Sequence, residues 1–401
     1  MSNGSSFKGS SDTSASTPVP MLDVNRQNAP LLEEIEAAMA QVARSGAFVH
    51  GPACREFEAA MADYCGTQHA VGCASGSDAL LLALMVLGIE SGDEVIIPSF
   101  TFFATASAVS RLGAKPVFAD ILPDTFNLDP TDVARKITPA TKAIMPVHLF
   151  GQCAEMAALA EIAHAAGDIP IVEDAAQAIG AEYQGRRAGS LGTLGCFSFY
   201  PTKNLGGFGD GGMLTTDDGA LAAKLRQLRD HGQHPRYHHA MVGVNSRLDT
   251  LQAAVLNVKL GHLNRWATGR QRNAARYESE FARLELREQL RVPTVADECK
   301  SVWNQYTVRL PAERRNAFQQ HLAERQIGAA IYYPIPLHLQ ECFADLGYEQ
   351  GSLPVTELAA KEVLSLPIFA ELATLEQDRV IQATSEFCGV EYSASSAHRA
   401  A

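Results

Sequence analysis

Short apolar runs recur along the first half of the chain, and segments with helical spacing separate them. The runs that we predict as strands are His69–Cys73, Glu94–Pro98, Lys115–Ala119, Ala143–Val147 and Ile169–Glu173. The segments that we predict as helices include Leu31–Val42, Phe57–Tyr64, Ala79–Leu87, Phe103–Leu112 and Met156–Ala166. Buried strands that alternate with helices are typical of a mostly parallel sheet with helices on both faces. The pattern therefore predicts an α/β fold.

The second half of the chain has a different pattern, which changes again near Val302. Helices are predicted over Ser246–Lys259 and Gln271–Leu284, followed by a strand at Asn304–Arg309, a helix at Arg314–Arg325 and a strand-like run at Ile327–Tyr333. With 401 residues the chain is long enough for two domains. We expect a disordered tail over 1–20, a large domain over 21–260, a small α+β domain over 261–390 and a second tail over 391–401.

Composition excludes several classes of function. The net charge of −12 argues against a nucleic-acid surface, which needs a basic stripe, and no apolar run is long enough to cross a membrane. The eight cysteines form no CxxC pair, which is typical of reduced thiols in a cytoplasmic protein. Four histidines between His231 and His239 lack the cysteines or paired acids that would complete a metal site, so no metal is expected.

An acid and a lysine stand where one kind of cofactor chemistry needs them. Asp174 follows the apolar run that ends at Glu173, and ligands of parallel sheets bind at the carboxyl ends of the strands. Lys203 lies further along, at the start of a Gly-rich turn. A lysine can form a Schiff base with the aldehyde of pyridoxal 5'-phosphate, and an acid can keep the pyridine nitrogen protonated. The pair predicts a pyridoxal phosphate enzyme.

Other residues suit the phosphate and the ring of that cofactor, although each also has a simpler interpretation. The run Ser75–Asp78 opens an apolar helix, whose N-terminus can bind phosphate through its N–H groups and the Ser77 hydroxyl, or can simply be capped. Ser198 can add a second hydroxyl. Phe102 can stack on the pyridine ring or fill the core.

The runs Val172–Gln177, Ser198–Lys203 and Gly209–Gly212 resemble the DegT/DnrJ/EryC1/StrS sugar aminotransferases, and the resemblance extends from about Met21 to Gly389. It implies the fold-type-I, aspartate aminotransferase-like fold of pyridoxal phosphate enzymes that act on nucleotide-linked keto-sugars. The catalytic residues that it implies are Lys203 and Asp174, and the cofactor-binding residues are Gly76, Ser77, Phe102, Asp174, Gln177, Ser198, Lys203 and Asn245. Members of the family are homodimers, in which Asn245 would reach the neighbouring subunit's phosphate and Arg247 its substrate.

A narrower resemblance concerns the substrate. The runs Asp230–Gln233, Arg236–His239, Gly243–Thr250 and Tyr333–Leu337 resemble the branch that aminates UDP-2-acetamido-2-deoxy-3-keto-glucuronic acid with L-glutamate, for surface polysaccharides such as the O-antigen of lipopolysaccharide. The substrate-binding residues that it implies are Arg247, His238, Tyr332 and Tyr333. An arginine suits a sugar carboxylate because it can bind it through two parallel hydrogen bonds. Tyr332 replaces a histidine of that branch; it keeps a hydrogen-bond donor but carries no positive charge.

Three alternatives stay open at this point. The substrate can be another dTDP- or UDP-linked 3-keto or 4-keto sugar. A dehydratase of the same fold is a second alternative, although such relatives carry histidine at the position of Lys203. The third is a non-catalytic regulatory protein of the same fold, against which the presence of Lys203, Asp174 and Ser198 argues.

Overall fold

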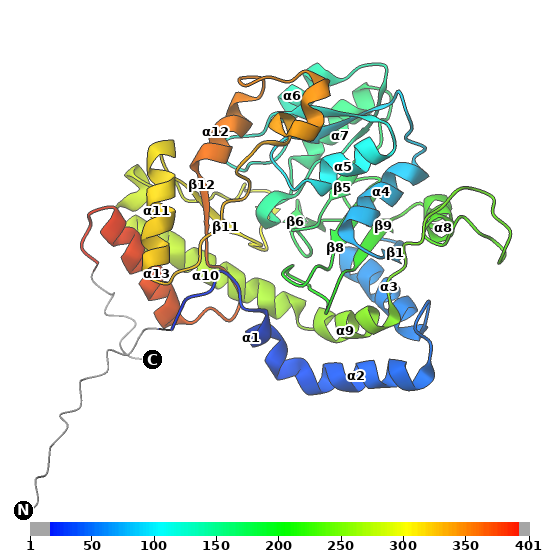
Figure 1. Ribbon diagram of the computed structural model, residues 1–401, viewed down its shortest axis with the longest axis horizontal. Helices are drawn as coiled ribbons and strands as arrows, with labels where there is room; N and C mark the ends of the chain where they lie inside the picture. Colours follow the sequence, from blue (N-terminus) through cyan, green and yellow to red (C-terminus); the bar gives the residue numbers. More distant parts are fainter. Residues whose placement is uncertain (1–16, 393–401) are drawn as a thin grey trace, which may run out of the picture.

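The computed structural model describes residues 17–392 (Figure 1). Residues 1–16 and 393–401, which make up most of the two expected tails, lie outside the described residues. Within the first expected tail, Val19 is fully buried. Its N–H donates to the carbonyl of Gln326 at 2.9 Å, and its own carbonyl accepts from the N–H of Gly328 at 2.8 Å. The packed chain therefore begins before Met21.

Seven strands form a mostly parallel sheet at the centre of the molecule. They are β1 (His69–Cys73), β2 (Glu94–Pro98), β3 (Lys115–Ala119), β4 (Thr141–Ile144), β5 (Val172–Asp174), β8 (Leu194–Ser198) and β9 (Gly212–Thr216). One part has the order β3-β2-β4 and the other β5-β8-β9-β1, and two parallel bridges, Ile144 with Ile171 and Val147 with Asp174, join them. Only β9 runs antiparallel to its neighbours in this sheet. The α/β prediction is confirmed.

Neighbouring residues of each strand point to opposite faces of the sheet, and helices bury both faces. Val71 and Ile97 belong to a core shared with α4 (Gly76–Val86), α5 (Ala104–Arg111) and α8 (Gly219–Leu228). Ala70 and Ile96 belong to a core on the other face, shared with α3 (Pro52–Cys65), α7 (Met156–Ala165) and α9 (Thr250–Leu260). The helix α2 (Leu32–Ser45) lies along α9 (Figure 1).

The C-terminal part has its own apolar cluster, which includes Tyr277, Phe318 and Leu364. Its elements are α10 (Leu263–Arg283), β11 (Tyr306–Arg309), α11 (Ala312–Glu324), α12 (Pro354–Glu362), β12 (Val363–Leu366) and α13 (Thr374–Phe387), with β11 antiparallel to β12. The remaining elements are α1 (Val24–Asn28), α6 (Pro130–Lys136), β6 (Glu182–Tyr183), β7 (Arg186–Arg187), β10 (Cys299–Lys300) and short 3-10 turns. The domain boundary expected after residue 260 stays a prediction.

Some expected elements differ from those in the structure. The strand-like run at Ile327–Tyr333 is wrong, since its residues form only isolated bridges, including Ala330 with Ser365. The helix expected from Ser246 begins at Thr250, because Asn245 and Asp249 form isolated bridges and the backbone of Asp249 is extended. No helix among residues 17–392 is long and apolar enough to cross a membrane, and the same residues contain no metal-binding group of His, Cys, Asp and Glu.

Candidate active site

A cavity of about 580 Å³ lies at the carboxyl ends of β5 and β8, and we call it the central cavity. Nine of the predicted site residues line it: Gly76, Ser77, Phe102, Asp174, Gln177, Ser198, Lys203, Tyr332 and Tyr333. It is also lined by residues that were not predicted, among them Thr101, Tyr200, Thr202, Asp210 and Gln305. Tyr200 and Thr202 adjoin Lys203 in the sequence, whereas Gln305 comes from the C-terminal part and gives no local signal.

Asp174 is the last residue of β5 and is almost fully buried. Its Oδ2 accepts a hydrogen bond from the Thr105 hydroxyl at 2.8 Å, and its Oδ1 accepts one from the N–H of Ala176 at 3.2 Å. Burial raises the pKa of Asp174, and these hydrogen bonds partly oppose that rise. A cation bound in the cavity would stabilise the ionised carboxylate, as a protonated pyridine nitrogen does. Thr105 was not predicted, because nothing in the sequence places it beside Asp174.

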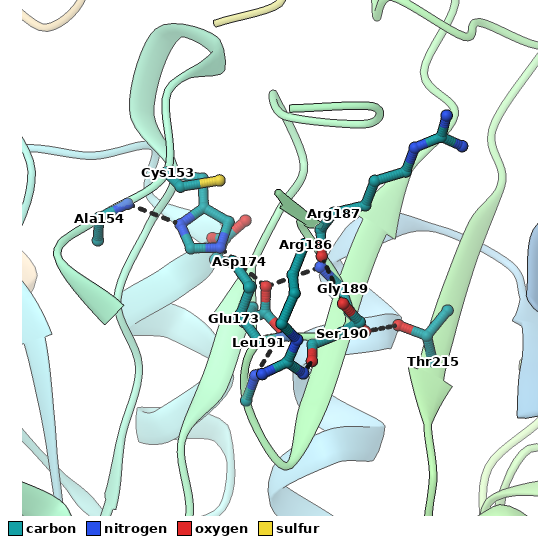
Figure 2. A network of polar contacts seen from close by, with 12 residues as sticks. Cys153, Ala154, Glu173, Asp174, Arg186, Arg187, Gly189, Ser190, Leu191 and Thr215 are labelled. Atoms are coloured by element: carbon teal, nitrogen blue, oxygen red, sulfur yellow. Dashed lines mark hydrogen bonds and ion pairs between the residues drawn. The ribbon is translucent and has the colours of Figure 1, made fainter. Parts of the chain in front are cut away.

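The neighbouring Glu173, also in β5, stands in a network of polar contacts (Figure 2). It is fully buried, and its carboxylate accepts hydrogen bonds from the N–H groups of Gly189, Leu191 and Gly192, each at 2.7 Å. The imidazole of His148 also bonds to it, with 2.9 Å between Nε2 and Oε2. These four bonds hold β5 in place, so the position of Asp174 is set before any ligand binds.

The tautomer of His148 follows from its second contact. The N–H of Ala154 donates to Nδ1 at 3.1 Å, so Nε2 carries the ring proton and donates it to Glu173. The sequence gives no signal for the pair of His148 and Glu173, because the two residues lie 25 positions apart and only the fold brings them together.

Lys203 follows a tight turn in which its N–H donates to the carbonyl of Tyr200 at 2.8 Å. Among the described residues, its Nζ has no hydrogen-bond partner. Burial lowers the pKa of Lys203, and the negative charge of Asp174 acts in the opposite direction. A neutral amine is the form that attacks an aldehyde. The next residue, Asn204, accepts a hydrogen bond from the Nδ2 of Asn304 at 2.7 Å, which ties the turn to the C-terminal part.

The start of α4 combines both interpretations of the Ser75–Asp78 run. The Ser75 hydroxyl accepts from the N–H of Asp78 at 3.1 Å and so caps the helix. Gly76 and Ser77 line the cavity, where the N–H groups of a first helical turn can bind an anion. A Cβ on Gly76 would lie 2.5 Å from the Cβ of Ser198, so only glycine allows this close approach. We call Gly76, Ser77 and Ser198 the phosphate cradle.

Gly76→Ala is expected to weaken binding of pyridoxal phosphate about tenfold or more, because moving the start of α4 away from Ser198 costs about 1–3 kcal/mol. The control is Gly261→Ala, where the nearest atom to the new Cβ is 3.7 Å away and the backbone has helical φ. Titration of the unloaded protein, followed by visible absorbance, measures both affinities. Equal affinities for the two variants would contradict this account of the cradle.

Aromatic side chains form the opposite wall of the cavity. Phe102 is 59% exposed, and its ring centroid lies 6.4 Å from that of Tyr333. The Tyr333 hydroxyl accepts from the Nε2 of Gln177 at 3.2 Å, while the Oε1 of Gln177 accepts from the N–H of Phe150 at 2.8 Å. Gln177 therefore holds this wall against the end of β5. The exposed Phe102 ring is therefore accessible to a flat ligand in the cavity.

Three predicted site residues, His238, Asn245 and Arg247, do not line the cavity of their own chain. They belong to residues 230–249, which we call the projecting segment and which follow α8, where the chain loops out from the body (Figure 1). His238 and Asn245 are exposed, and Nη1 of Arg247 donates to Oδ1 of Asp230 at 2.6 Å. Among the described residues that line the cavity, Lys203 is the one basic side chain.

These features fit pyridoxal phosphate. The amine of the partly buried Lys203, which has no hydrogen-bond partner among the described residues, faces the same cavity as the buried Asp174, whose ionised form needs a cation. The phosphate cradle adds N–H groups and hydroxyls at a helix start, and Phe102 adds an exposed ring. Lys203 would hold the aldehyde carbon, Asp174 the pyridine nitrogen and the cradle the phosphate.

Comparison with known proteins finds relatives over most of the chain. Residues 31–385 match the DegT/DnrJ/EryC1/StrS aminotransferase family. The chain is 47% identical to the dTDP-3-amino-3,4,6-trideoxy-alpha-D-glucose transaminase of Streptomyces venezuelae, over 93% of this chain and 97% of the relative. It is 45% identical to the UDP-2-acetamido-2-deoxy-3-oxo-D-glucuronate aminotransferase of Pseudomonas aeruginosa, over 89% and 96%. A pleiotropic regulatory protein of Geobacillus stearothermophilus is 48% identical, over 92% and 98%.

Solved structures show the same fold. The S. venezuelae DesV structure, a complex with a ketimine intermediate, has a TM-score of 0.89 and 47% identity, and the match covers 92% of this chain and 98% of that one. The ntda structure of Bacillus subtilis with bound cofactor PMP has a TM-score of 0.86 and 32% identity, over 93% and 86%.

Proposed function

The chain belongs to the DegT/DnrJ/EryC1/StrS aminotransferase family, and on that premise we propose its specific reaction. It is a pyridoxal phosphate-dependent aminotransferase of nucleotide-linked keto-sugars. We propose that the keto-sugar is UDP-2-acetamido-2-deoxy-3-keto-glucuronic acid, that L-glutamate donates the amine, and that the 3-amino product serves surface polysaccharide synthesis in the cytoplasm. We further propose a homodimer whose active sites lie at the subunit interface.

The observation that carries this proposal is the position of Arg247. Among residues 17–392, Lys203 is the single basic side chain that lines the central cavity, and the chemistry itself requires it. A uronic acid brings a carboxylate that needs another cation. Arg247 is partly exposed on the projecting segment, outside its own cavity, where a second copy of the chain can reach it. The Pseudomonas aeruginosa relative, whose substrate is a 3-oxo-glucuronate, supports the same choice.

In this proposal, the chain's own residues place and move protons around the cofactor. Bound pyridoxal phosphate supplies an electron sink for the bonds at the reacting carbon. Asp174 keeps a proton on the pyridine nitrogen, and Thr105 and the N–H of Ala176 hold the carboxylate in place for this. Lys203 carries the proton to and from the reacting carbon as a general acid and base.

Binding contacts complete the proposed mechanism. The phosphate cradle would hold the phosphate, together with Asn245 of a second copy. Phe102 would cover the ring, and Gln177 would keep Tyr333 beside it. Tyr332 and Tyr333 would donate hydrogen bonds to the sugar, and His238 would contact it from the projecting segment of the second copy.

A second candidate substrate is a dTDP-linked 3-keto sugar without a carboxylate. The Streptomyces venezuelae relative acts on such a nucleotide sugar according to its name. Tyr332 also favours this candidate, because a neutral hydroxyl does not need a charged group opposite it.

Visible absorbance of the loaded protein tests the substrate. Adding L-glutamate, or the UDP-linked 3-amino uronic acid, is expected to remove the absorption of the lysine-bound cofactor, because either amine displaces Lys203. A dTDP-linked 3-amino sugar without a carboxylate is the comparison. If glutamate and the dTDP-linked sugar remove the absorption but the uronic acid does not, the second candidate substrate is favoured over the uronic acid. A protein that binds cofactor but responds to no amine would instead be a regulatory member of the family.

A further inference from the structure

Ser246 stands between two of the residues that are proposed to act in a neighbouring subunit, Asn245 and Arg247. Unlike them it is fully buried. Its hydroxyl donates a hydrogen bond to Oδ2 of Asp78 at 2.8 Å and accepts one from the N–H of Ala74 at 3.1 Å. These two partners flank the turn Ser75–Ser77 at the start of α4. The projecting segment is thus bonded directly to the residues on either side of the turn that carries Gly76 and Ser77 of the phosphate cradle.

The start of α4 is the more firmly held of the two sides. β1 leads into it, Ser75 caps it, and a Cβ on Gly212 would lie 2.2 Å from the carbonyl oxygen of Ser75, so the neighbouring strand packs tightly against the turn. The projecting segment is more open. Val242 is 91% exposed and Tyr237 75% exposed. The hydrogen bond between Ser246 and Asp78 therefore fixes the projecting segment against the start of α4.

Ser246 also has a backbone contact, which does not depend on its side chain. Its N–H donates to the carbonyl of Arg229 at 2.8 Å, beside a bridge between Asp230 and Asn245. The hydroxyl adds two hydrogen bonds that hold the segment against the start of α4. Serine suits this position, because a hydroxyl donates and accepts at once and is small enough to be buried.

We propose that Ser246 is a positioning residue that holds Asn245 and Arg247 for use in the cavity of a second copy of the chain. This rests on the proposed function, in which those two side chains act across a dimer interface. Ser246 does not line the central cavity. It acts through its neighbours, and it does so for the site of the other subunit.

Mixed dimers, purified from two differently tagged chains, test this assignment. In the first, one chain carries both Lys203→Ala and Ser246→Ala and its partner is unchanged, so the working cavity receives a projecting segment that lacks the Ser246 hydroxyl. In the second, one chain carries Lys203→Ala and the other Ser246→Ala, so the working cavity receives an intact segment. The reference is a mixed dimer with Lys203→Ala alone.

The first dimer is expected to bind pyridoxal phosphate about tenfold more weakly at the working cavity and to have a raised KM for the nucleotide sugar, since a buried hydrogen-bond pair is lost. The second dimer is expected to match the reference. Ser246→Thr, which keeps the hydroxyl, should restore affinity in the first arrangement. If Ser246→Ala does not fold, Asp78→Ala removes the acceptor alone and takes its place.

Other patterns would overturn the proposal. If only the second dimer binds the cofactor more weakly, Ser246 acts on the phosphate cradle of its own chain. Equal losses in both, together with a lower Tm, would make its role purely structural. The same two arrangements with Arg247→Ala or Asn245→Ala test the premise separately. If those losses do not depend on which chain carries the change, the shared site fails, and the role of Ser246 fails with it. If the losses with Arg247→Ala and Asn245→Ala depend on which chain carries the change, but the loss with Ser246→Ala does not, only the role of Ser246 is refuted.

Discussion

Lys203→Ala is expected to lower turnover by on the order of 10⁴-fold or more, because one side chain supplies both the covalent attachment of the cofactor and the proton transfer. The variant should still bind pyridoxal phosphate, since Asp174 and the phosphate cradle are unchanged. It should lack the absorption of the lysine-bound form. Borohydride reduction followed by mass spectrometry of peptides should place the cofactor on Lys203 in the unchanged protein and on no lysine in the variant.

A matched control is Lys224→Ala, which removes an exposed lysine on α8. This variant should keep full turnover and the labelled Lys203 peptide. Normal turnover of Lys203→Ala would refute the catalytic assignment. Loss of turnover together with loss of all cofactor binding would indicate a damaged cavity. Lys203→Gln, whose side chain is closer in length to lysine, would then show whether turnover is still lost when the cofactor binds.

The pH dependence of cofactor loading has a definite sign. Burial lowers the pKa of Lys203 below its ordinary value of 10.5, so the neutral amine is present at lower pH than in a free lysine. The rate of cofactor loading should therefore stay constant as the pH falls from 10.5 toward the lowered pKa of Lys203. It should decrease only when the pH drops through that lowered pKa. Between the lowered pKa of Lys203 and pH 10.5, the unfolded chain binds more protons at Lys203 than the folded chain does. The free energy of unfolding of the unloaded protein therefore rises with pH in this range. Lys203→Ala should lack this contribution to the rise in Tm.

Sequence patterns predict the parts of this molecule that have a strong local signal. The strands at 69–73, 94–98 and 115–119 are confirmed with their predicted bounds, because each is a short apolar run between turn residues. β8 and β9 were not predicted. Gly195 is the second residue of β8, where a Cβ would lie 2.4 Å from the Cα of Gly189, and such a glycine makes a buried strand look like a turn.

The site shows the same limit. Asp174 and Lys203 could be paired from sequence because the chemistry of one cofactor demands both types of residue. Thr105 and Glu173 could not, because their roles depend on which backbone groups and side chains the fold brings to them. Asn245 and Arg247 are a different case. They lie outside the cavity of their own chain, so only the family resemblance suggests a role for them.

Arg247→Ala is expected to lower kcat/KM for the UDP-linked 3-keto uronic acid by about 10- to 100-fold, because hydrogen bonds to a charged group are worth about 1.5–3 kcal/mol. The effect should appear mainly in KM. For the same nucleotide sugar with a hydroxymethyl group in place of the carboxylate, Arg247→Ala should lower kcat/KM much less, since that sugar offers no charge for the guanidinium. Steady-state kinetics with the two sugars, and the half-reaction with L-glutamate, give the comparison.

Two further variants separate the charge of Arg247 from its geometry. Arg247→Lys keeps a cation but cannot bind a carboxylate through two parallel hydrogen bonds, so it should recover only part of the loss. Asp230→Asn leaves Arg247 in place and removes the negative charge 2.6 Å from it, so carboxylate binding should be retained if the pair serves only to orient the guanidinium. Equal losses with both sugars and with glutamate would contradict a carboxylate contact. Such a result would point to a general effect of Arg247 on the cavity and favour a substrate without the acid.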